Sequence, residues 1–118
     1  MKRLLIPVVC LALLTACGER HKAKTTIKAF LKDNVTASDY HTDFFSLDST
    51  RHVGDSTINA LRSRTEEIGI YNKGVTFGGS PSPDGKLLYM RARIITGSDT
   101  VTQTFYLSPD LKHVVAVK

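Results

Sequence analysis

The sequence lacks an apolar run long enough to cross a membrane, and it contains only two cysteines, Cys10 and Cys17. Its longest apolar stretch, residues 4–14, has eleven residues including Pro7, whereas a spanning helix needs about 20. The common catalytic motifs are also missing, since there is no Gly-x-Ser-x-Gly, His-Glu-x-x-His or Gly-rich phosphate loop. We therefore expect a protein that is not an enzyme, with a hydrolase built on other residues as an alternative.

The first residues have the organisation of a secretory signal peptide. Lys2 and Arg3 provide a positive start, residues 4–14 provide a short apolar middle, and small residues follow at positions 15 and 16. A positive start, a short apolar segment and small residues before a cleavage point are typical of exported proteins.

The end of this segment resembles a known signal. Leu14-Thr15-Ala16-Cys17 resembles the lipobox of bacterial lipoproteins. The resemblance implies cleavage before Cys17 and attachment of fatty acyl chains, such as palmitate, to Cys17. One acyl chain holds a protein only marginally at a membrane, whereas two or more hold it stably. The expected organisation is a removed signal peptide (1–16), a lipid anchor and short spacer (17–21), and one domain (22–118). No cysteine then remains for a disulfide.

Cleavage changes the charge balance. The full chain has a formal net charge of +5, and loss of Lys2 and Arg3 leaves +3 on 102 residues. Five cations close to the anchor either attract an anionic leaflet or form a solvated helix face: Arg20, Lys22, Lys24, Lys28 and Lys32. Gly18-Glu19 follows the cysteine, without the Asp of lipoproteins retained in the inner membrane. We expect the outer membrane, facing the periplasm, and no nucleic-acid partner.

Hydrophobic periodicity predicts a mixed domain. Residues 22–33 place apolar side chains on one helical face, and Asn34 is a plausible stop. A strand is expected at 41–48, and a second helix from a cap at Asp55 or Ser56 to Gly69. The remaining pattern predicts antiparallel strands around 70–78, 86–96, 100–107 and 111–118.

This order of elements predicts an α+β fold. Two N-terminal helices would pack on a curled antiparallel sheet of about four strands, leaving one sheet face partly open. The arrangement looks like the cystatin-like or NTF2-like architecture of small envelope lipoproteins. The resemblance rests on element order, so it transfers no functional residues.

The open sheet face is the main candidate site. Alternation along two neighbouring strands would gather six side chains on one surface: Tyr89, Arg91, Arg93, Thr102, Thr104 and Tyr106. Guanidinium groups bind carboxylates bidentately and tyrosines offer rigid contact area, which suits an anionic ligand or a protein partner. The alternative is a solvated sheet face stabilised by cross-strand pairs.

A weaker candidate is the spacing of Asp39, His41 and Asp43. In an extended strand these three side chains would share one face, which is a spacing that suits a metal. The alternative is a polar outer face, with Tyr40 and Phe44 turned inward. We expect no metal and no cofactor.

The resulting hypothesis is a lipid-anchored, non-catalytic binding or assembly module that contacts an envelope protein through its sheet face. A small-ligand-binding domain with a pocket between helix and sheet is the alternative, followed by the hydrolase.

Overall fold

The computed structural model describes residues 2–37, 39–97 and 99–118, with side chains from residue 18 onward. Two helices, a short 3₁₀ helix and four strands follow in the order α1 (Lys2–Asn34), β1 (His41–Ser49), α2 (Asp55–Arg64), η1 (Thr65–Glu67), β2 (Leu88–Thr96), β3 (Asp99–Leu107) and β4 (Val114–Val117). The predicted α+β class is confirmed.

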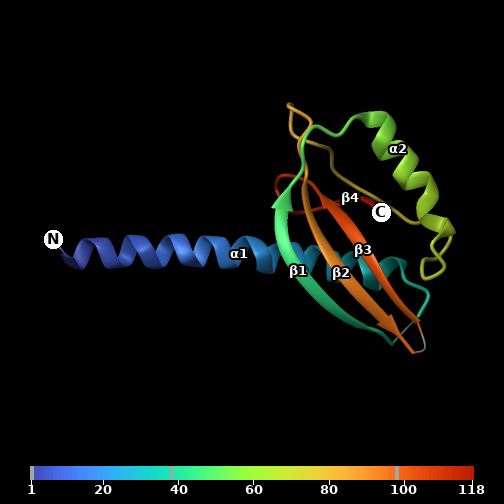
Figure 1. Cartoon of the computed structure of the whole chain (residues 1–118), viewed down its shortest axis with the longest axis horizontal. Helices are drawn as coiled ribbons and strands as arrows, with labels where there is room; N and C mark the ends of the chain where they lie inside the picture. The colour runs from blue at the N-terminus through green and yellow to red at the C-terminus, as the bar shows by residue number, and fades with distance from the viewer. Residues whose placement is uncertain (1, 38, 98) are drawn as a thin grey trace.

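The four strands form one antiparallel sheet in the order β1-β2-β3-β4 (Figure 1). β2 and β3 pair along nine residues each, up to Thr96 and Asp99, and Gly97 beyond the end of β2 has a φ of 44°. β1 pairs with β2 through a bulge between Phe44 and Leu47, and β4 pairs with β3 over a short length. The predicted strands at 41–48, 86–96 and 100–107 are therefore confirmed, and the last strand is shorter than predicted.

The C-terminal half of α1 covers one face of this sheet. Its apolar residues are buried as the helical spacing predicted: Ala23, Ile27, Phe30 and Leu31. They pack against the alternating strand residues Met90, Ala92, Ile94, Phe105 and Leu107. Full burial of one large apolar side chain stabilises a fold by about 1.5–3 kcal/mol, so this layer is the main source of stability.

α2 packs on the opposite face, at the β4 side of the sheet. Its buried residue Ile58 forms a second cluster with Leu87 and Val115, with Tyr106 packed against it. Leu87 and Tyr106 directly precede Leu88 and Leu107 of the main core, and successive strand residues point to opposite faces. The predicted strand between the two helices is present as β1. The expectation that the helices cover one face of the sheet is corrected, because α1 and α2 cover different faces and α2 packs over the β4 side of the face that was expected to be open.

The bounds of α2 also differ from the prediction. The helix is preceded by Gly54 at the N-cap position, with no side-chain capping bond, so neither Asp55 nor Ser56 is the cap. It ends at Arg64 and tightens into the 3₁₀ turn η1, well before Gly69. The Thr65 hydroxyl donates back to the Leu61 carbonyl at 2.9 Å, within this transition.

Residues 70–78 do not form the predicted strand. Their described backbone makes a single isolated bridge, between Tyr71 and Val35. Asn72 N–H donates to the Asn34 carbonyl at 2.8 Å, and Thr76 N–H donates to the Asn34 side-chain oxygen at 3.2 Å. Gly74, with a φ of 77°, interrupts the extended conformation. This segment is therefore fastened to the end of α1, and Asn34 is the helix stop that the sequence predicted.

Arginine side chains bind carbonyl oxygens on both outer strands. Arg20 Nη2 of α1 lies 3.4 Å from the Phe44 carbonyl and 3.5 Å from the Phe45 carbonyl of β1. On the other side, Arg62 Nε of α2 donates to the Val115 carbonyl of β4 at 2.7 Å. Each helix is thereby connected by a polar contact to the outer strand beside it.

No helix in the described part of the chain combines the length and the apolar character needed to cross a bilayer. The side chain of Cys17, the predicted lipid attachment point, lies outside the described side chains.

Candidate functional site

The six side chains predicted to form the open sheet face lie on neighbouring strands in direct register. Tyr89 pairs with Tyr106, Arg91 with Thr104, and Arg93 with Thr102. Their strand neighbours Met90, Ala92 and Ile94 are fully buried under α1, so the six residues point to the other side of the sheet. The rings of Tyr89 and Tyr106 lie 6.3 Å apart and are tilted by 48°.

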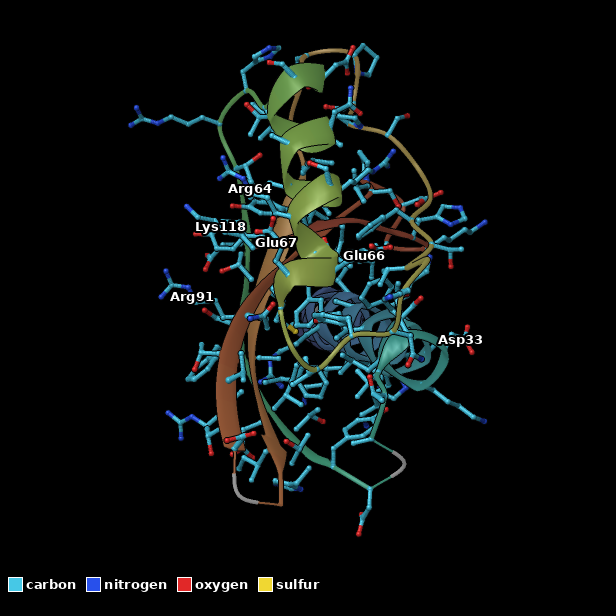
Figure 2. The ribbon with its side chains drawn as sticks, turned by 90° about the vertical axis from the view of Figure 1, so that its right-hand side faces the viewer. Asp33, Arg64, Glu66, Glu67, Arg91 and Lys118 are labelled. Atoms are coloured by element: carbon cyan, nitrogen blue, oxygen red, sulfur yellow. The ribbon has the colours of Figure 1, made fainter. Side chains whose placement is uncertain are left out.

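This face is hollowed. A cavity of about 670 Å³, which we call the sheet hollow, is lined by Ser49, Thr50, Arg51, Tyr89, Arg91, Thr102, Thr104, Tyr106 and Lys118. Figure 2 shows Arg91 and Lys118 on the side of the sheet that faces away from α1. Lys118 is held beside β3 because its backbone exchanges two hydrogen bonds of 2.9 Å with Thr104. The volume lies in the range of small-molecule sites.

The sheet hollow has a positive character. Its lining includes three cationic side chains, Arg51, Arg91 and Lys118, and no Asp or Glu. Within the described residues, ion pairs join His41 to Asp43 and Lys86 to Asp84, and none involves these three cations. Guanidinium groups in this state present free donors to carboxylate or phosphate oxygens. The arrangement can bind an anion, with the tyrosines as apolar and hydrogen-bonding walls.

Arg51 is positioned by the segment that leads from β1 to α2. Thr50 N–H donates to the Leu87 carbonyl at 2.8 Å, and Leu87 N–H donates to the Thr50 hydroxyl at 2.9 Å. Three residues after Thr50, Val53 N–H donates to the Gly85 carbonyl at 2.7 Å. These bonds extend the β1–β2 pairing beyond the strands and fix Arg51 at the rim of the sheet hollow.

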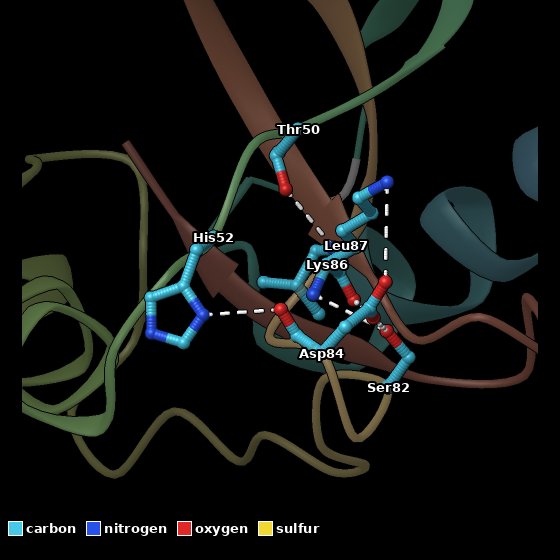
Figure 3. Close-up of polar contacts among 6 residues, drawn as sticks. All are labelled: Thr50, His52, Ser82, Asp84, Lys86 and Leu87. Atoms are coloured by element: carbon cyan, nitrogen blue, oxygen red, sulfur yellow. Dashed lines mark hydrogen bonds and ion pairs between the residues drawn. The ribbon is translucent and has the colours of Figure 1, made fainter.

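The turn opposite this segment is itself held by polar contacts (Figure 3). Ser82 donates a hydrogen bond to Asp84, which lowers the pKa of that carboxyl group, with a smaller contribution from the nearby Lys86. His52 Nδ1 lies 3.1 Å from the Asp84 carbonyl. The predicted turn at Pro83-Asp84-Gly85 is present, and it supports the position of residues 50–53.

A second hollow, of about 430 Å³, continues along the same face toward β1. It shares Tyr89, Arg91 and Thr102 with the sheet hollow, and its full lining is Phe45, Ser46, Asp48, Tyr89, Arg91, Arg93 and Thr102. All six predicted residues therefore line one hollow or the other. The sequence did not predict Arg51, Lys118 or Phe45 here, because their positions depend on how β1 pairs and on the path of the chain beyond β4.

The space between α1 and the sheet is filled by side chains. Ile27, Leu31 and Phe105 lie in that layer and have no exposed surface. A ligand pocket in this layer was the expected form of the small-ligand alternative; the larger hollow lies on the other face.

Of the three residues Asp39, His41 and Asp43, which the spacing predicted to share one face, the structure brings two into contact. His41 Nε2 lies 3.0 Å from Asp43 Oδ1, with both side chains exposed, while Asp39 precedes β1. Tyr40 and Phe44 pack against the main core, as the polar-outer-face alternative predicted. No group of three His, Cys, Asp or Glu side chains in the described ranges is placed to hold a metal ion.

No model of a protein family, no curated protein and no solved structure matches this chain.

Proposed function

We propose that this chain is a lipid-anchored, non-catalytic protein of the cell envelope that binds an anionic partner surface through its open sheet face. In this proposal residues 1–16 are removed, Cys17 carries acyl chains, and the single domain lies at the outer membrane, facing the periplasm. The lipobox-like residues Leu14-Thr15-Ala16-Cys17 support the anchor. For the fold we propose a cystatin-like or NTF2-like architecture, which the helix-covered antiparallel sheet supports.

One observation carries the binding function: three cations that form no ion pair with a carboxylate among the described residues surround a hollow walled by two tyrosines. Solvated cations on a sheet face are ordinary, but here Arg51, Arg91 and Lys118 come from separate segments and converge on one cavity. Like charges that converge on one cavity repel one another, and an anion bound between them offsets this repulsion. An acidic segment of an envelope protein fits this surface.

A photo-crosslinking amino acid in place of Thr104, which lines the sheet hollow, tests the proposal in intact envelopes. We expect a discrete protein adduct that disappears when Arg91→Glu reverses one charge of the hollow. Lys73→Glu is the matched control, because Lys73 is exposed in the 70–78 segment and changes the net charge equally. Absence of an adduct, or an adduct of equal yield in the Arg91→Glu protein, would contradict binding through this face.

The volume of the sheet hollow also supports a second candidate, a small anionic molecule as the ligand. In that case native mass spectrometry of protein isolated from envelopes should show a bound small molecule, lost with Arg91→Glu, and Thr104 should give no protein adduct.

A further inference from the structure

The bulge of β1 exposes an aromatic side chain. Phe44 pairs with Ala92 and Leu47 with Met90, which leaves Phe45 and Ser46 together opposite Arg91. Phe44 turns inward onto the main core. Phe45 is 42% exposed, and among the described residues it is the one large apolar side chain that is exposed. A bulge re-aims side chains locally, which is how two consecutive phenylalanines come to have different surroundings.

Cationic groups surround this bulge. The Arg93 guanidinium lies 5.9 Å from the centre of the Phe45 ring. Lys24 and Lys28 of α1 place their ammonium groups 5.9 and 5.8 Å from the centre of the Phe44 ring. Arg20 contacts the two phenylalanine carbonyls. The acidic residues of the same region are Glu19, Asp43 and Asp48, of which Asp43 is engaged by His41.

The bulge is also close to the proposed lipid anchor. Arg20 follows Cys17 by three residues, which is roughly 4.5 Å along a helix axis. Its contacts with Phe44 and Phe45 hold this turn of α1 against the bulge. Figure 1 shows α1 passing behind β1 and leaving the domain on that side. Acyl chains on Cys17 would therefore bring the β1 bulge next to the bilayer surface.

We infer that the β1 bulge is a membrane-contact surface that orients the domain on its own bilayer. Phe45 enters the headgroup region, and Arg20, Lys24, Lys28 and Arg93 contact lipid phosphates. Aromatic and cationic side chains are the groups that favour this interface. The inference rests on the lipid anchor of the proposed function and adds a second contact to it. Its result is a fixed orientation in place of a domain that tumbles on a tether.

The absence of tryptophan from the chain provides a direct test. Phe45→Trp places a single tryptophan, whose indole can be excited selectively over the four tyrosines, at an exposed position on the bulge. The variant is expressed from the full-length sequence, and its lipidated product is purified. This product is reconstituted into vesicles of phosphatidylethanolamine and phosphatidylglycerol with brominated acyl chains. We expect at least twofold quenching of the indole relative to vesicles without bromine. The matched control is Tyr106→Trp, on β3 beside α2, and we expect no quenching there.

Unquenched fluorescence at position 45, or equal quenching at positions 45 and 106, would overturn the membrane contact. Mass spectrometry of the same sample reports separately on the anchor. An unacylated Cys17 would refute the lipid anchor and this inference together, whereas an acylated protein with an unquenched Phe45→Trp indole refutes this inference alone.

Discussion

The Tyr71 hydroxyl is a buried polar group whose removal should stabilise the protein. Tyr71 is 6% exposed, and its oxygen has no hydrogen-bond partner among the described residues. The ring itself packs at 6.0 Å from Phe30. Leaving a buried hydroxyl unpaired costs about 1–3 kcal/mol. Because Tyr71→Phe keeps the ring and removes the hydroxyl, we expect the free energy of unfolding to increase by about 1 kcal/mol.

Urea denaturation followed by circular dichroism at pH 7 measures this change. For a domain of this size, 1 kcal/mol corresponds to a rise in Tm of about 4–8 °C. Tyr89→Phe is the matched control, since its hydroxyl lies on the open sheet face and its removal should change stability by less than about 0.5 kcal/mol.

The alkaline limb gives a second, independent readout. Burial raises the pKa of Tyr71 above its ordinary value near 10. Below pH 10 the folded and unfolded states both hold the proton, and the stability associated with it is fully present. As the pH rises above 10 the unfolded state ionises first, so stability is lost by up to about 1.4 kcal/mol per pH unit. Tyr71→Phe should remove this contribution to the slope.

Two results would refute the reasoning. A Tyr71→Phe protein that is less stable at pH 7 by about 1 kcal/mol would show that the hydroxyl is hydrogen-bonded. If the stability of the Tyr71→Phe protein fell with pH above 10 as steeply as that of the unmodified protein, Tyr71 would ionise as readily in the folded state as in the unfolded state.

Two further predictions concern turns. The Ser108 hydroxyl donates to Asp110 at 2.5 Å and lowers the pKa of that carboxyl group. The stability that the ionised Asp110 carboxylate provides is present above pH 4 and is lost as the pH falls through its lowered pKa. Asp110→Asn should therefore make the free energy of unfolding less dependent on pH below 4. An unchanged pH dependence in this range would contradict the prediction. Gly85 has a φ of 79°, and an added Cβ would meet His52, so Gly85→Ala should destabilise the protein by about 1–2 kcal/mol in urea. Gly69→Ala, which meets nothing, is its control, and equal effects of the two would refute the strain argument.

Alternation along the chain was sufficient to predict the central hairpin. Met90, Ala92 and Ile94 are buried as their spacing of two required, and the residues between them reach the other face. The same reasoning gathered the six candidate site residues, because β2 and β3 are consecutive strands joined by a short hairpin. Where neighbours in the sheet are neighbours in the chain, a sequence pattern is enough to place side chains.

The errors occurred where tertiary contacts decide the conformation. Residues 70–78 alternate like a strand, yet Tyr71 and Phe77 pack their rings around Phe30 of α1 from an irregular backbone. Arg51 joins the sheet hollow only because residues 50–53 pair with residues 85–87. Neither the packing of residues 70–78 on α1 nor the pairing of residues 50–53 with 85–87 produces a periodic pattern in the sequence. The irregular conformation of 70–78 and the place of Arg51 in the candidate site therefore could not be predicted.

The contacts of Arg20 and Arg62 with the outer strands limit how a partner can approach. The edge of a sheet is a template on which another chain can add a strand through its backbone. Here a guanidinium group occupies carbonyl oxygens of β1 and another occupies one of β4. Recognition through the open face would then depend on side chains instead of a shared backbone ladder. Substitutions on that face should change partner choice without altering the sheet, so the surface can diverge while the fold is retained.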